Sequence, residues 1–165
     1  MDIQEQWPDI RRQFHRLHRG AVDASLATVN PDGTPHVTPI GSLVLLAECR
    51  GIYWEHFPRR LPANLAHGQR VCILLVNHRP MFWLKSLWRG RFDSPPAIRL
   101  LARAGARREA TREEMALWHR RIRPFRRFKG YRLLWSDLTD VRELTFERLL
   151  PVSTGAMTAK PASIG

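Results

Sequence analysis

The sequence predicts a mainly β protein, an antiparallel sheet or β-barrel with flanking helices. Two hairpins follow one another, the first around Pro31-Asp32-Gly33-Thr34 and the second around Arg50-Gly51. Proline presets φ in such turns and glycine supplies positive φ, while the flanking segments are rich in branched and aromatic residues. Residues 70–77 (RVCILLVN) form a nearly continuous apolar run, which is typical of a strand buried on both faces. Consecutive hairpins of this kind are typical of a meander that begins a sheet or barrel.

Three helices are expected beside these strands. Residues 2–19 place apolar side chains three or four positions apart, as one face of an amphipathic helix requires. Residues 59–68 have a proline near the start and a glycine at the end, which favours a short helix. Thr111 and Glu114 form a capping box that opens a third helix, with basic residues on its polar face.

Further strands are expected at residues 43–49, 97–106 and 139–150. Residues 79–96 contain four prolines or glycines and are predicted to be irregular, although their aromatic content indicates that they pack on something. Residues 1–152 are therefore expected to form one domain, followed by a flexible tail at 153–165.

The charge is strongly basic, with 27 Lys and Arg against 15 Asp and Glu. Residues 99–132 contain twelve of these cations and only three carboxylates, so most of the excess is local. Nucleic acids, acidic membrane surfaces and phosphorylated ligands are all compatible with such a charge. The basic face between 107 and 132 lacks a recognisable nucleic-acid docking motif, and a solvated helix face is its ordinary interpretation.

Common catalytic signatures are missing. The sequence has no dinucleotide or phosphate-binding glycine loop, no nucleophile elbow and no clustered histidines, so no metal site and no catalytic residue are predicted. Cys49 and Cys72 are interpreted as small core residues. No apolar run is long enough to span a membrane and the first residues do not resemble a signal peptide, so a cytoplasmic protein without a membrane partner is expected.

One ordered set of motifs remains. A strand–turn–strand at residues 27–37 (ATVNPDGTPHV) is followed by Gly51–Trp54, the pair Arg59-Arg60, Asn64-Leu65 and the strand at 70–76. This order resembles the pyridoxamine 5'-phosphate oxidase-like, FMN-binding split-barrel family, most clearly over residues 20–80. The resemblance implies a split β-barrel of the FMN-binding type, FMN as cofactor, and a homodimer with the flavin at the subunit interface. Six tryptophans, more than one small core readily buries, agree with an apolar interface.

The resemblance also implies where FMN binds. Arg59 and Arg60 precede a short helix, and guanidinium groups with helix N-terminal amides suit a phosphate dianion. Backbone donors and an apolar wall for the isoalloxazine ring are expected from two segments, and Asn64 either contacts the phosphate or positions the helix. The ring-binding candidates are His36, Val37, Thr38, Pro39, Tyr53, Trp54 and Glu55.

The predicted function is thus an FMN-binding flavoprotein that transfers electrons or hydride to an unknown small molecule. Oxidation of pyridoxamine 5'-phosphate itself is not expected, because the family's C-terminal substrate-binding signature is reduced here to Arg148–Pro151. Two alternatives stay open. One is a non-enzymatic binder of flavin or haem, or a deazaflavin protein, on the same fold. The other is a nucleic-acid-binding protein that uses the basic face at 107–132.

Overall fold

The computed structural model describes residues 2–18, 24–56, 60–67, 70–135, 138–150 and 152–158. Seven antiparallel strands form one sheet in the order β2-β1-β5-β6-β7-β4-β3. The strands are β1 (Ala24–Val29), β2 (Pro35–Ile40), β3 (Val44–Leu45), β4 (Arg50–Trp54), β5 (Arg70–Val76), β6 (Ala97–Glu109) and β7 (Asp140–Leu150). The mainly β prediction is therefore confirmed.

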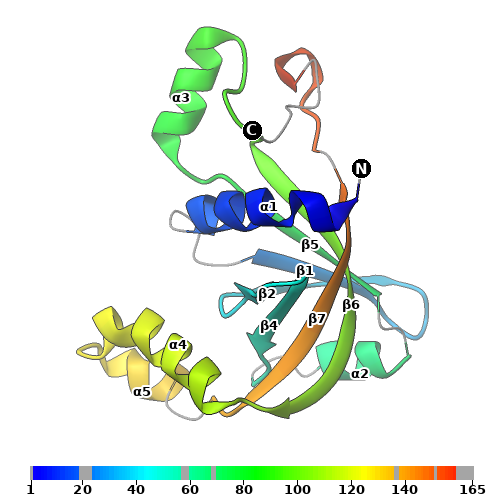
Figure 1. The fold of residues 1–165 in the computed structure, drawn as a ribbon, viewed down its shortest axis with the longest axis vertical. Helices are drawn as coiled ribbons and strands as arrows, with labels where there is room; N and C mark the ends of the chain where they lie inside the picture. The colour runs from blue at the N-terminus through cyan, green and yellow to red at the C-terminus, as the bar shows by residue number, and fades with distance from the viewer. Residues whose placement is uncertain are drawn as a thin grey trace.

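Five α-helices surround the sheet (Figure 1): α1 (Ile3–His18), α2 (Arg60–His67), α3 (Pro80–Arg89), α4 (Arg112–Ile122) and α5 (Lys129–Trp135). Two 3-10 turns, at Arg123–Phe125 and Gly155–Thr158, complete the described elements. In Figure 1 α3 lies at the top, α4 and α5 at the lower left, and α2 at the lower right. The three flanking regions are therefore well separated across the sheet.

The core has two parts. The larger part joins the inner face of the sheet to α1, whose Trp7, Ile10 and Phe14 are buried there. The smaller part lies under α4, where Trp118 stacks on Trp54 of β4 with ring centroids 4.9 Å apart. These two parts bury three of the six tryptophans within one chain. Trp88 on α3 stays 86% exposed, so only part of the tryptophan surplus needs cover from outside.

The first hairpin turn forms as predicted. Gly33 has a φ of 83° and donates its N–H to the carbonyl of Asn30 at 2.9 Å. The Asp32 carboxylate accepts from both the backbone and the hydroxyl of Thr34, at 3.0 and 2.6 Å. These two hydrogen bonds are the main reason that the pKa of Asp32 lies below its usual value. The turn therefore has a fixed backbone beside β2.

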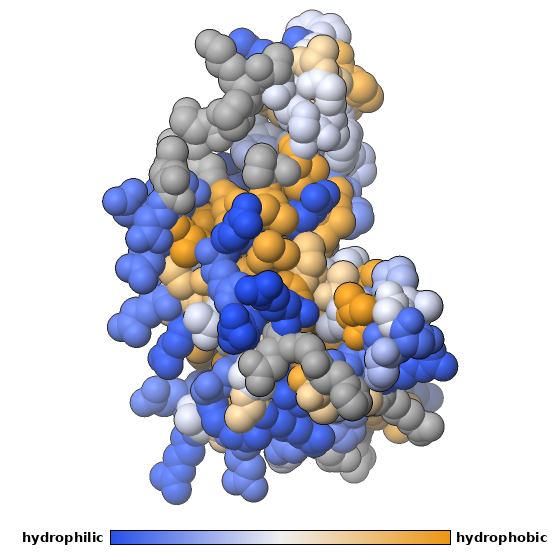
Figure 2. All heavy atoms as spheres, turned by 90° about the vertical axis from the view of Figure 1, so that its right-hand side faces the viewer, coloured by the Kyte–Doolittle hydropathy of each residue, from blue (hydrophilic) through white to orange (hydrophobic). Residues whose placement is uncertain are grey.

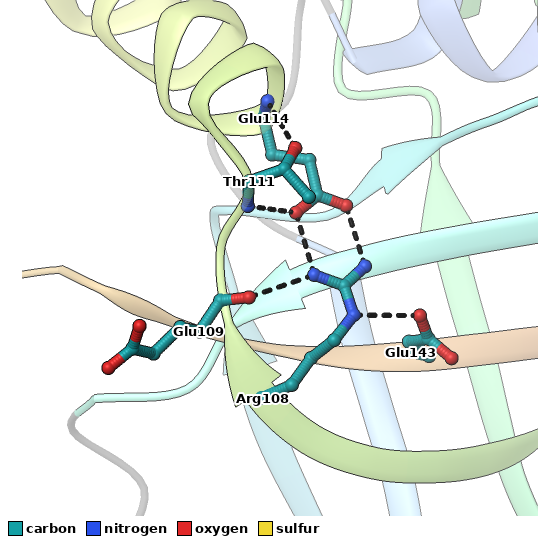
Figure 3. Close-up of polar contacts among 5 residues, drawn as sticks. All are labelled: Arg108, Glu109, Thr111, Glu114 and Glu143. Atoms are coloured by element: carbon teal, nitrogen blue, oxygen red, sulfur yellow. Dashed lines mark hydrogen bonds and ion pairs between the residues drawn. The ribbon is translucent and has the colours of Figure 1, made fainter.

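The capping box of α4 is also confirmed and is part of a larger network (Figure 3). Thr111 accepts from the Glu114 backbone, and the Glu114 carboxylate accepts from the Thr111 N–H at 2.8 Å. The same carboxylate accepts hydrogen bonds from both terminal nitrogens of Arg108, each at 2.8 Å, while Arg108 Nε donates to the Glu143 carboxylate. The hydrogen bonds from Arg108 lower the pKa of Glu114. One arginine thus ties α4 to β6 and β7.

Three expectations need correction. Residues 80–89 form helix α3, because Pro80 starts it and Gly90 ends it with a φ of 64°. The strand expected at 43–49 is reduced to two residues, since Glu48 and Cys49 adopt positive φ in a tight turn. Strand β5 buries only one face, so Cys72 is half-exposed rather than a core residue, whereas Cys49 is buried. Within the segment expected as a tail, Gly155–Thr158 form a 3-10 turn, and Phe92 donates its N–H to the carbonyl oxygen of Met157.

Candidate functional site

Helix α2 is fixed to the first hairpin by one buried side chain. Asn64 is 2% exposed, and its Nδ2 donates to Thr28 Oγ1 at 3.0 Å and to Asn30 Oδ1 at 2.8 Å. Leu61 and Leu65 of the same helix enter the main core. Both hydrogen bonds are donated by the side-chain NH2 group of Asn64, and they hold α2 against the hairpin. Positioning the helix is one of the two roles expected of Asn64.

Arg60 is the first residue of α2 and is exposed. No ion pair among the described residues uses it, and the first turn of α2 contains no acidic residue. After the hydrogen bonds from Thr34, the positive charge of Arg60 also contributes to the lowered pKa of Asp32, which places Arg60 within electrostatic reach of the turn. Its predicted partner Arg59 lies outside the described residues. The corner formed by α2 and the first hairpin, called here the α2 corner, therefore has an exposed cation at a helix N-terminus, where the first backbone N–H groups have no partner within the helix.

The outer face of the sheet continues from this corner. Cross-strand registers align Val37, Ala27, Cys72 and Leu101 in one row across β2, β1, β5 and β6. Cross-strand partners share a face of the sheet, and Val37 is 58% exposed while the other three are half-buried. Together with Leu74, they are called here the outer sheet face. Figure 2, which views the right-hand side of Figure 1, shows apolar side chains gathered in the middle of that side among hydrophilic ones.

The four candidates on β2 divide between two faces. Val37 and Pro39 are exposed and lie opposite Ala27 and Ser25, on the outer side. His36 and Thr38 lie opposite Thr28 and Leu26, whose side chains are buried, and the His36 ring nitrogen Nε2 is 3.0 Å from Thr38 Oγ1. Only Val37 and Pro39 therefore join the outer sheet face.

The three candidates at the end of β4 are buried and bonded within the chain. Tyr53 is fully buried and donates its hydroxyl to Glu55 Oε1 at 2.7 Å. Glu55 is 2% exposed and accepts two hydrogen bonds from Arg142 of β7, from Nε at 2.8 Å and from Nη2 at 2.7 Å. Trp54 is held between its stacking contact with Trp118 and hydrogen bonds of its backbone to Ser42. In one chain these buried side chains stabilise the β4–β7 pairing.

Burial and the neighbouring carboxylate explain the electrostatics of this cluster. Burial, together with the negative charge of Glu55, raises the pKa of Tyr53 far above its usual value. Burial opposes the charge of Arg142, but its hydrogen bonds to Glu55 outweigh that effect and raise its pKa. Tyr53 is thus held neutral, and Glu55 and Arg142 form a buried ion pair.

A model of the family described as pyridoxamine 5'-phosphate oxidase matches residues 13–150. The chain belongs to this family. No curated protein matches the sequence.

Two solved structures have the same split-barrel fold. HupZ from Group A Streptococcus is 17% identical, with 88% of this chain and 96% of that chain covered and a TM-score of 0.57. An FMN-binding protein from Syntrophomonas wolfei is 16% identical, with 92% and 95% covered and a TM-score of 0.56. The fold expected from the resemblance, a split β-barrel of a pyridoxamine 5'-phosphate oxidase-like protein, is therefore shown.

Within this member of the family, the sequence interpretation missed two features of the site region. Arg142 was not singled out, because nothing in a strand sequence shows that an arginine faces a buried carboxylate on the neighbouring strand. The outer sheet face was missed because β5 reads as apolar on both sides. Among the described residues, no group of three or more His, Cys, Asp or Glu could hold a metal ion.

Proposed function

We propose that the protein is a flavoprotein that binds FMN, with the FMN phosphate at the α2 corner. The observation that carries the proposal is the exposed Arg60 at the start of a helix that Asn64 fixes to the first hairpin. A phosphate dianion gains most from guanidinium donors and helix N-terminal amides held in one geometry. The residues present therefore fit the group, and Arg59 is proposed as the second cationic donor.

The outer sheet face is proposed to cover the isoalloxazine ring and to form a homodimer. Val37 and Pro39 lie on the strand that leaves the hairpin turn, so an apolar ring can reach them from a phosphate at the α2 corner. Ala27, Cys72, Leu74 and Leu101 extend this surface over three further strands, and half-exposed apolar side chains gain free energy when a second copy covers them. Tyr53, Trp54 and Glu55 have buried side chains, so their proposed contacts with the ring are made through the backbone.

FMN, when bound, supplies the redox chemistry, and the chain supplies binding and exclusion of water. Arg60 neutralises and orients the phosphate, and the dimer interface shields the ring. The favoured reaction is oxidoreduction of an unidentified small molecule. The family's own vitamin B6 substrate is not proposed, because the C-terminal recognition signature is reduced to Arg148–Pro151.

The cofactor is tested by titrating the protein with FMN and following flavin fluorescence. The proposal requires quenching with one FMN per subunit and thermal stabilisation, which amounts to about 2.7 kcal/mol at a hundredfold excess over Kd. Absence of both effects at saturating FMN would contradict it. The same titration with haem and with a deazaflavin decides between the cofactors that this fold could hold. Reduction of the bound flavin by nicotinamide donors then separates an oxidoreductase from a flavin carrier.

The assembly is tested by light scattering with FMN present. A homodimer has twice the chain mass of 19.2 kDa. Leu74→Arg places a charge in the proposed interface and should give monomers, whereas Leu84→Arg on exposed α3 is the matched control and should leave dimers intact. A stable mass of 19.2 kDa for the unaltered chain would refute the interface.

A further inference from the structure

A second surface, unconnected with the flavin proposal, is formed by the end of α4, the 3-10 turn at Arg123–Phe125 and helix α5. Residues 115–136 contain seven Arg or Lys and no acidic residue. Five of these cations are exposed and take part in no ion pair among the described residues: Arg120, Arg123, Arg126, Arg127 and Lys129. This segment, called here the basic platform, is therefore a concentrated and uncompensated positive surface.

The basic platform also exposes large apolar side chains. Phe128 is 65% exposed and Leu133 is 81% exposed, and Phe125, Leu134 and Leu117 are exposed as well. The other side of the platform is anchored, because Tyr131 and Trp135 pack against the core cluster under α4. Phe125 is linked to that anchor by ring contact with Trp135, at a centroid distance of 5.5 Å. Exposed apolar side chains are thus interspersed with exposed cations along this segment.

Not every arginine of this region is available. Arg121 donates to the backbone carbonyls of Gly41 and Leu43, at 2.7 and 3.0 Å, and also contacts His18 at the end of α1. It therefore fixes α4 against the rest of the chain. The other arginines of α4, Arg112 and Arg120, are exposed.

We propose that the basic platform docks on the surface of an anionic phospholipid bilayer. Exposed Phe and Leu side chains among Arg and Lys are the combination by which peripheral helices insert into the headgroup region and attract anionic lipids. A nucleic acid would use the cations and could stack on the phenylalanines, but it would gain nothing from Leu133 and Leu134. Charge complementarity and apolar exposure together therefore favour the lipid.

This proposal revises the expectation that the protein has no membrane partner, which rested on the lack of a spanning segment. In the part of the chain that the structure describes, no helix is long and apolar enough to cross a bilayer. The binding proposed here is peripheral. In Figure 1 α4 and α5 lie on the opposite side of the molecule from α2, so docking leaves the α2 corner uncovered.

The experiment is sedimentation of the full chain with phosphatidylcholine vesicles, with and without phosphatidylglycerol. The chain should sediment with the anionic vesicles only, and high salt should weaken the binding. Arg126→Glu with Arg127→Glu should reduce affinity by roughly 25-fold or more, since each basic residue near such a surface contributes about fivefold. Phe128→Ser with Leu133→Ser should reduce it by roughly tenfold or more, as expected for two lost apolar insertions.

Matched controls make each outcome decisive. Arg70→Glu with Arg91→Glu changes the net charge equally at exposed positions elsewhere, and Met81→Ser with Leu84→Ser removes exposed apolar groups from α3; both should leave binding unchanged. If the control variants lost as much vesicle affinity as the platform variants, the binding would be non-specific attraction, and this outcome would overturn the proposal. So would binding of a single-stranded oligonucleotide that the arginine reversals abolish and the serine variants leave intact, without vesicle binding. The proposal would also be overturned if the particle mass in solution were lower for Phe128→Ser with Leu133→Ser than for the unaltered chain, because a second copy of the chain would then cover this surface.

Discussion

Arg60 at the α2 corner and the residues at the end of β4 were all expected to contact one flavin, yet Arg60 is exposed and the others are buried. The α2 corner presents an exposed cation, Arg60, in no ion pair among the described residues, at the start of a helix. The cluster at the end of β4 consists of Tyr53, Glu55 and Arg142, which hydrogen-bond to one another, while Arg142 also donates to a backbone carbonyl of β6. Polar residues in a family motif can therefore serve either the ligand or the barrel, and burial distinguishes the two roles.

The largest effect is expected where the buried ion pair is broken. Glu55→Ala leaves the largely buried Arg142 guanidinium without its carboxylate and with only the Gly105 carbonyl as partner, so the free energy of unfolding should fall by about 3 kcal/mol. Chemical denaturation of the apo-protein measures it. Flavin affinity, compared in conditions where the variant is still folded, should be reduced equally for FMN and riboflavin.

The matched control is the exposed pair of Arg103 and Glu147, whose side chains are 51% and 32% exposed. Glu147→Ala should cost less than about 1 kcal/mol, because solvent screens such pairs. If Glu55→Ala were as mild as Glu147→Ala, the cluster would not stabilise the barrel, and a direct role of Glu55 at the flavin would have to be reconsidered.

A smaller loss is expected at the bond that joins α2 to the hairpin. Asn64→Ala removes two buried hydrogen bonds and should destabilise the fold by about 1–3 kcal/mol. Because the helix start moves relative to β1, FMN should also bind more weakly. A double-mutant cycle with Thr28→Val, followed by thermal unfolding, measures the coupling. Strict additivity of the two changes would contradict the role assigned to this bond.

The parts of this architecture that local chemistry controls could be predicted, whereas the parts that depend on long-range placement could not. The turn at Gly33 and the cap at Thr111 follow from spacings of a few residues, and both formed as expected. Arg142 meets Glu55 across 87 positions of sequence, and no local pattern encodes that pairing. Strand β5 was assigned two buried faces because its residues are apolar on both sides, but in the single chain only one face is buried and the other is half-exposed.

The smallest effect is expected in the pH dependence of stability. It arises at the contact between His18 of α1 and Arg121 of α4. Burial, with the charge of Arg121 close by, lowers the pKa of His18 to about 4. The folded protein keeps this imidazole neutral, while the unfolded chain takes up a proton as pH falls below the usual value of 6.5. Stability should therefore decrease as pH falls from 6.5 towards 4, by about 1 kcal/mol between pH 7 and pH 5 after allowance for solvent screening. Denaturation curves at pH 7 and pH 5, for the unaltered chain and for His18→Gln, check this. The free energy of unfolding of the variant should not change between the two pH values. If it decreased as much as in the unaltered chain, the pH dependence would belong to other groups.

The most direct test of the account compares FMN with riboflavin, which lacks the phosphate, on the unaltered chain and on Arg60→Ala. Charge-assisted hydrogen bonds of this kind contribute roughly 1.5–3 kcal/mol, so FMN should bind about tenfold to a hundredfold more weakly to the variant. Riboflavin affinity should be the same for both proteins, and Arg126→Ala on the basic platform should change neither. Equal losses for FMN and riboflavin, or an FMN loss as large in Arg126→Ala as in Arg60→Ala, would contradict a phosphate site at the α2 corner.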